Sequence, residues 1–114
     1  GGADPQESGL MILEVATLQV RPGQAAACEQ AFAQAQRIIA AMPGYGGHDM
    51  QRCLEHEHQY VRQVRWARLQ DHTEGFRGAP QHPKWRALLH HFYDPFPTVL
   101  HYSPVFPSES GSIA

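Results

Sequence analysis

A chain of 114 residues, 42% hydrophobic and 18% charged, has the composition of a single ordinary globular domain. Its nine basic and eleven acidic side chains give a formal net charge of -2 with no basic cluster, which argues against nucleic acid as a partner. No run of about 18 apolar residues is present, so we also expect no membrane partner.

Both ends of the chain are expected to lie outside the folded domain. Residues 1–10 are polar and lack the features of a signal peptide, so we interpret them as a leader or an expression scar. Residues 11–105 would form the domain, and residues 106–114 a flexible tail rich in Ser, Gly and Pro. Cys28 and Cys53 lack disulfide-framework or CxxC spacing, and two reduced thiols indicate a cytoplasmic protein.

The hydrophobic pattern predicts four strands and two helical regions in the order βαββαβ. The strands are expected over residues 10–20, 46–55, 60–68 and 98–102, with the polar turn EHEHQ joining the middle pair as a hairpin. The first helix covers residues 24–42, where apolar residues follow three-four spacing. Asp71 is expected to cap a turn that Gly75 and Gly78 break, and Pro83 opens the second helix before Asp94-Pro95 ends it.

This order is that of an α+β, ferredoxin-like fold, in which an antiparallel sheet carries helices on one face. The opposite face of such a sheet needs a cover. We therefore expect a homodimer that forms through the open sheet face.

The abundant histidines do not have the spacing of a metal site. His90 and His91 are adjacent and lie about 100° apart around a helix, so they cannot easily share an ion. His90 and Asp94 have better spacing, but Asp94 precedes a proline, and His56 and His58 lie in a polar hairpin. We expect no metal at these positions.

Nucleophilic catalysis also has little support, because the serines lie near the two ends and both cysteines lie on expected core faces. A pocket for an organic ligand is the third option, since the broken second helix leaves space between helices and sheet. Its walls would come from Trp66, Phe76, Trp85 and Phe92, although rings at helical spacing usually pack in a core.

Two ionisable residues stand out near this expected pocket. His72 follows the predicted cap, where the positive end of a helix would lower its pKa and favour the neutral imidazole; an exposed turn histidine is the alternative. Glu14 places a carboxylate within LMILEVATL, where burial without a partner is costly. It either pairs with an arginine such as Arg62 or Arg65, or serves the pocket.

Four stretches of the chain resemble the antibiotic biosynthesis monooxygenase family over roughly residues 11–105: MILEVATLQVRPGQ, MPGY, VRWARLQDHTEGFRGAPQHPKW and LLHHFYDPFPTVLHY. The commonest of these marks is a Trp at a strand end with a His six residues later, here Trp66 and His72. The family comprises small dimeric α+β barrels. Members with known activity oxidise polycyclic phenols or quinols with dioxygen, without metal or flavin.

The resemblance implies a cofactor-independent monooxygenase that acts on a small aromatic phenol or quinol, with dioxygen as co-substrate and no bound cofactor. A deprotonated, electron-rich ring can itself pass an electron to dioxygen, so the protein needs only a base, a dry cavity and donors that stabilise an anion. Trp66 would line the cavity and His72 would be the base, with Glu14 or His90 as the fallback. The substrate-binding residues would be Arg62, Arg65, Phe76, Trp85, His90 and Phe92.

Two other functions remain open from the sequence. The first is a non-catalytic barrel that binds aromatic or reactive small molecules without converting them. The second is a heme-binding or heme-degrading relative, but that branch carries an Asn on the first strand, whereas this chain contains no Asn and has Ala16 near that place.

Overall fold

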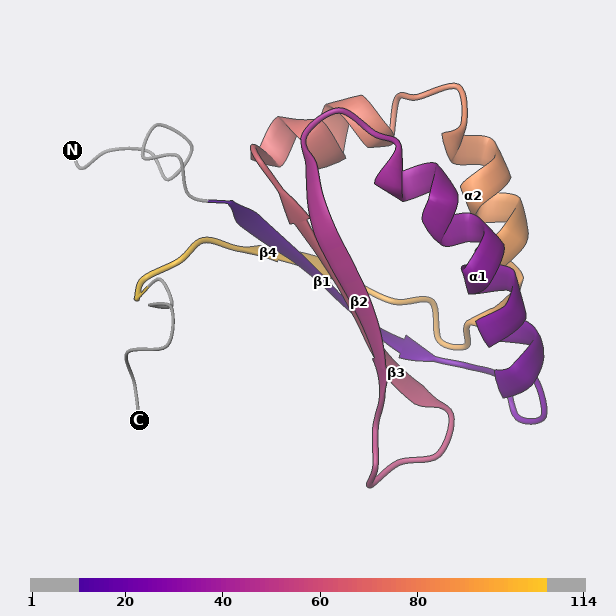
Figure 1. Ribbon diagram of the computed structural model, residues 1–114. Coiled ribbons are helices and arrows are strands. Elements are labelled where there is room, and N and C mark those ends of the chain that lie inside the picture. The colour runs from indigo at the N-terminus through magenta and orange to yellow at the C-terminus, as the bar shows by residue number, and fades with distance from the viewer. Residues whose placement is uncertain (1–10, 107–114) are drawn as a thin grey trace.

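The computed structural model describes residues 11–106 and confirms the predicted order of elements (Figure 1). The expected leader at residues 1–10 and all but the first residue of the expected tail at residues 106–114 lie outside this range, so the division of the chain stays a prediction. The elements are β1 (Ile12–Gln19), α1 (Ala25–Ala40), β2 (Tyr45–Arg52), β3 (Gln59–Trp66), the π-helix η1 (Asp71–Phe76), α2 (His82–Leu89), the 3-10 helix η2 (His90–Phe92) and β4 (Val99–Tyr102).

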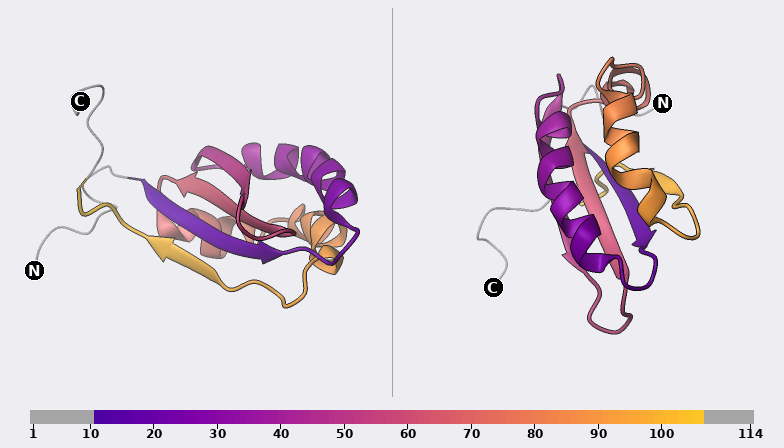
Figure 2. Two further views of the ribbon diagram at one scale, coloured as in Figure 1. Left: turned by 90° about the horizontal axis from the view of Figure 1, so that it is seen from below. Right: turned by 90° about the vertical axis from the view of Figure 1, so that its right-hand side faces the viewer.

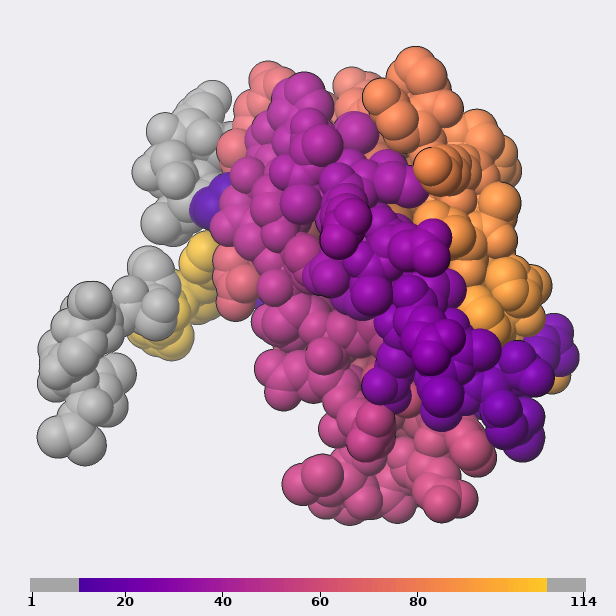
Figure 3. All heavy atoms as spheres, turned by 45° about the vertical axis from the view of Figure 1, so that its right-hand side comes forward, coloured from indigo at the N-terminus to yellow at the C-terminus, as the bar shows by residue number. Residues whose placement is uncertain are grey.

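The four strands form one antiparallel sheet in the order β2-β3-β1-β4. The helices α1 and α2 lie next to each other on one face of this sheet (Figure 2). In the space-filling view the two helices meet along this side of the molecule, and the β2–β3 hairpin extends beyond them (Figure 3). This is the predicted ferredoxin-like α+β fold, and in the single chain the sheet is open.

The core lies between the helices and the inner face of the sheet. Alternate residues of β1 point inward, and the other residues of that strand point to the outer face. The buried stripe of α1 meets this inner face and consists of Cys28, Phe32, Ala35 and Ile39. The three-four spacing of the sequence therefore identifies the correct side of the helix.

The chain leaves α1 through Gly44, which has a φ of +82°. L side chains rarely adopt this conformation, and a Cβ at Gly44 would also collide with the side chain of Asp71. This glycine therefore allows the turn before β2 to pack closely against the start of η1.

The structure corrects the predicted end of the second strand. The predicted strand runs to residue 55, whereas β2 stops at Arg52 and Leu54 is 92% exposed. The hairpin closes earlier than predicted because the Cys53 N–H donates to the carbonyl of Gln59 at 2.9 Å. His58 then completes the turn with a φ of 67°.

The predicted capped turn is also different. Asp71 does not cap the following helix; its Oδ2 accepts a hydrogen bond from the backbone N–H of Arg68 at 3.0 Å. Gly75 lies inside η1 and does not break it, whereas Gly78 follows its end. This helix is a π-helix, in which each N–H donates to the carbonyl five residues earlier, as from Arg77 to His72 at 3.1 Å. No helix within residues 11–106 is both long and apolar enough to span a bilayer.

Candidate functional site

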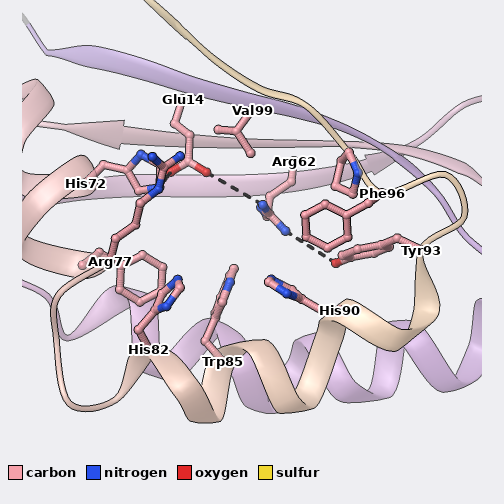
Figure 4. Close-up of a pocket in the computed structure, with 12 residues that line it drawn as sticks. Glu14, Arg62, His72, Arg77, His82, Trp85, His90, Tyr93, Phe96 and Val99 are labelled. Carbon is pink, nitrogen blue, oxygen red and sulfur yellow. Dashed lines mark hydrogen bonds and ion pairs between the residues drawn. The ribbon is translucent and has the colours of Figure 1, made fainter.

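A cavity of about 250 Å³ lies between the inner face of the sheet and α2 (Figure 4). This volume is slightly below the roughly 300–1,000 Å³ of typical small-molecule sites, so it suits a ligand of one or two rings. The cavity is lined by Glu14, Arg62, His72, Phe76, Arg77, His82, Trp85, His90, Tyr93, Phe96, Pro97 and Val99.

The sheet side of the cavity holds a buried acid–base pair. Glu14 and Arg62 lie on inward positions of the neighbouring strands β1 and β3 and are 2% and 6% exposed. Arg62 Nη2 lies 3.8 Å from Glu14 Oε2, and the indole Nε1–H of Trp66 donates to Glu14 Oε1 at 2.9 Å. The expected pairing of Glu14 with Arg62 is therefore present, and the same carboxylate lines the cavity.

The Arg62 guanidinium connects the sheet with α2 and the segment after it. Its Nη1 donates to the hydroxyl of Tyr93 at 3.5 Å, and its central carbon lies 5.1 Å from the ring centroid of Trp85. Its buried Nε has no hydrogen-bond partner within residues 11–106. Burial raises the pKa of Tyr93 to about 12, so its hydroxyl stays protonated and can donate to a ligand.

His72 lies behind Glu14 and has neighbours at both ring nitrogens. Its Nδ1 is hydrogen-bonded to His101 Nε2 at 2.8 Å, and its Nε2 lies 3.4 Å from Glu14 Oε1. The imidazole also stacks on the indole of Trp66, with 5.6 Å between the ring centroids. These contacts fix the ring beside the carboxylate.

The pKa of His72 is lowered to about 3, first by burial and then by the cations around it, of which Arg77 contributes most. The predicted direction is right, but the main cause is burial and not the end of a helix. The alternative of an exposed turn histidine is wrong, because His72 is only 4% exposed. Its imidazole is neutral at pH 7.

Two further histidines form the helical wall of the cavity. The ring of His82 packs edge-on against Phe76 at 4.9 Å, and that of His90 packs against Phe96 at 4.7 Å. Burial lowers the pKa of both histidines, which favours neutral rings that can accept or donate a proton. Arg77 stands at the exposed rim (Figure 4).

The charges of the lining favour an anionic ligand. With the histidines neutral, the ionised side chains are one carboxylate, Glu14, and two guanidinium groups, Arg62 and Arg77. A cavity with more positive than negative charge stabilises a bound phenolate or carboxylate. Within residues 11–106, no three His, Cys, Asp or Glu side chains are placed to hold a metal ion.

The sequence model of the family described as antibiotic biosynthesis monooxygenase matches residues 11–88. The chain belongs to this family. It is 47% identical over 95 residues to the uncharacterised protein YczJ of Bacillus subtilis (strain 168), a match that covers 83% of this chain and all of YczJ. The family resemblance found in the sequence is thereby confirmed.

Solved structures of the family have the same fold. A Bordetella bronchiseptica protein assigned to these monooxygenases is 30% identical, with a TM-score of 0.81 over 85% of this chain and 99% of its own. A point mutant of SnoaB from Streptomyces nogalater, a cofactor-independent oxygenase, is 16% identical, with a TM-score of 0.73 over 85% of this chain and 95% of its own. The likeness to SnoaB concerns the fold alone.

The structure brings six of the nine predicted site residues to the cavity: Glu14, Arg62, His72, Phe76, Trp85 and His90. Trp66 is fully buried beside Glu14 and His72 and does not line the cavity. Arg65 is exposed on the opposite face of the sheet, because it alternates with the inward positions Val64 and Trp66. Phe92 lies in the 3-10 helix η2, which turns its ring into the core.

Several residues of the site were missed from the sequence. Arg77, His82 and Phe96 lie in short or irregular segments whose direction no periodicity predicts. Tyr93 directly follows the 3-10 helix η2, so the spacing of the second helix does not predict its direction. His101 could have been found from the register of the last strand, which sets it directly opposite Glu14.

Proposed function

We propose that this chain is a cofactor-independent monooxygenase that oxidises a small phenol or quinol with dioxygen. Membership of the family supports an oxidation of this kind. The observation that carries the proposal is the Glu14 carboxylate beside the Arg62 guanidinium within the cavity, 3.8 Å apart. The carboxylate can take a proton from a phenol, and the guanidinium can stabilise the resulting phenolate.

Glu14 is better suited than His72 to take the proton. Both nitrogens of His72 already face other groups, and a pKa of about 3 makes its imidazole a poor acceptor. His90 is the alternative base, since its ring lines the cavity and is held neutral by burial. In this assignment Trp66 orients the Glu14 carboxylate, while Phe76 and Trp85 flank the substrate.

The reaction needs no further redox partner. The phenolate gives one electron to dioxygen, and the two radicals combine at a ring carbon. Loss of water then leaves a quinone, so that one oxygen atom enters the ring and the other leaves in water. The two protons of that water come from the phenol hydroxyl and from the ring carbon.

A protein that only binds such molecules is the rival function. It would not need a group that can accept a proton beside the ligand. Glu14 and the neutral His90 both line the cavity, and their presence favours catalysis over simple binding.

The functional test is oxygen uptake by the purified, metal-free protein with a chemically varied set of phenols and quinols. The Glu14→Gln variant, which keeps an acceptor for Trp66, should lose about 10²- to 10⁴-fold in kcat, the range for a removed general base. Glu57→Gln, on an exposed side chain of the hairpin, is the matched control and should keep full activity. Binding without oxygen uptake across the whole set would refute the proposal.

We further propose that the outer face of the sheet forms a homodimer interface. Leu100 and Tyr102 on β4 are 52% and 51% exposed, and they pair with Val15 and Leu13 of β1 on the same face. The helices cover only the other face. A second copy would bury this apolar strip, and two reduced cysteines in each chain fit a place in the cytoplasm.

A further inference from the structure

We propose that His72 and His101 form a proton path between Glu14 and solvent, which makes His101 a positioning residue for the oxidation. This inference rests on the proposed function, because it concerns the proton that Glu14 takes from the substrate. Its starting point is that Glu14 is only 2% exposed, and that a substrate in the cavity would cover the side of the carboxylate that lines it. A route to solvent would let Glu14 give up that proton while dioxygen reacts and recover one when water forms.

Strand pairing builds the path. β4 runs antiparallel to β1 with His101 directly opposite Glu14, so both side chains point to the inner face of the sheet. His72 reaches between them from η1 and touches both: its Nδ1 is 2.8 Å from His101 Nε2, and its Nε2 is 3.4 Å from Glu14 Oε1. The two nitrogens of the His72 imidazole thus face His101 on one side and Glu14 on the other.

The three side chains also connect the buried site with the surface of the protein. Glu14 and His72 are almost completely buried, whereas His101 is partly exposed near the end of an edge strand. His101 does not line the cavity, so it acts on the substrate only through His72 and Glu14.

Burial first, and then nearby positive charges, lower the pKa of both imidazoles and keep them neutral. The charged and titratable groups around His72 are Arg77 just after η1, Arg62 from β3, His82 from α2 and Glu14 from β1. Burial lowers the pKa of His101 as well, with Arg77 acting in the same direction and Glu14 opposing it. A neutral imidazole carries one proton and one free acceptor, which is the state that a relay requires.

The transfer balances with one proton entering and one leaving. The substrate hydroxyl gives its proton to Glu14, and Glu14 passes a proton to Nε2 of a His72 that is protonated on Nδ1. In the same step the Nδ1 proton of His72 moves to His101 Nε2, so that His72, a poor acceptor by itself, never becomes a cation. His101 then releases its own Nδ1 proton to water. The carboxylate is then restored, and the same path returns a proton when water forms later in the reaction.

The first test measures exchange of the His72 ring proton with solvent by ¹⁵N-edited NMR, in the absence of any substrate. His101→Gln keeps a hydrogen-bonding group next to His72 but cannot relay a proton. If His101 is the route, exchange in this variant slows at least tenfold; if His101 only shields His72, exchange becomes faster and the proposal is overturned. His56→Gln, at an exposed hairpin position, should leave the exchange rate unchanged.

The second test uses turnover and begins with the unmodified protein. In mixtures of H₂O and D₂O, its kcat should depend on the deuterium fraction along a curve, because more than one proton moves in the same step. His101→Gln should lower kcat about tenfold with an unchanged KM, and added imidazole should restore part of it. The path would be refuted if kcat of the unmodified protein depended linearly on the deuterium fraction and His101→Gln left kcat unchanged. If no phenol gave oxygen uptake but His101→Gln still slowed exchange of the His72 ring proton, only the proposed function would be refuted.

Discussion

Replacing Arg62 by Met removes the only guanidinium that the described part of the chain places beside the buried Glu14 carboxylate. Both side chains of this pair are less than a tenth exposed. Removing one partner of a buried ion pair costs about 3–5 kcal/mol, because the remaining charge has no counter-ion. The variant also loses the hydrogen bond to Tyr93 and the contact with the Trp85 ring, so we expect a cost in the upper half of this range.

The double variant Glu14→Gln with Arg62→Met separates the charge from the packing. No charge is left buried in this protein at the site of the pair, so its unfolding free energy should be only about 1–2 kcal/mol below that of the original chain. The two substitutions together would thus cost less than Arg62→Met alone. Such a difference is the mark of direct coupling between the two side chains.

Urea unfolding measures both quantities, and the fluorescence of the buried Trp66 and Trp85 reports the transition. The control is Arg21→Met, which breaks an ion pair between Arg21 and Asp94. Both side chains are at least half exposed, so this substitution should lower the unfolding free energy by about 1 kcal/mol or less. A cost below about 1 kcal/mol for Arg62→Met, or simple additivity in the double variant, would refute the idea that this pair is a coupled unit of the site.

Burial and exposure lead to three other predictions. The pKa of His72 is about 3 in the folded state against 6.5 ordinarily, so between these values the unfolded chain binds more protons, and stability falls as the pH drops through them. His72→Gln removes this effect. In urea titrations near pH 5, the variant should therefore show a slope of unfolding free energy against pH that is smaller by about 1.4 kcal/mol per pH unit. Because burial raises the pKa of Cys28 to about 11, a colorimetric disulfide reagent should label Cys53 alone in the native protein and both thiols in urea, and rapid native labelling of Cys28 would contradict this. Leu100→Glu should convert the proposed dimer to a monomer in light scattering, and an unchanged mass would place the interface elsewhere.

The fold follows from the sequence because local patterns encode it. The spacing along residues 24–42 predicts the correct face of α1, and the alternation of β1 places Glu14 inward with the core. The predicted element ends are less accurate, as at Leu54, because a hairpin closes wherever its hydrogen bonds allow. The pattern alone does not contain that information.

The candidate site is only partly predictable, for two physical reasons. Residue type and burial cost direct attention to Glu14 and to its pairing with Arg62, which the structure contains. By contrast, the positions of Arg77 and Tyr93 depend on a π-helix and on an irregular turn, neither of which has a simple sequence period. The contact between His72 and His101 depends on strand register, which becomes visible only after the sheet has formed.

The most direct measurement of the central claim is a crystal structure of the protein with a bound phenol that resists oxidation. We predict that its oxygen lies within hydrogen-bond distance of the Glu14 carboxylate and near the Arg62 guanidinium, with the ring next to Trp85. A phenol bound elsewhere, or one that lies in this cavity with its oxygen turned away from both Glu14 and Arg62, would contradict the account.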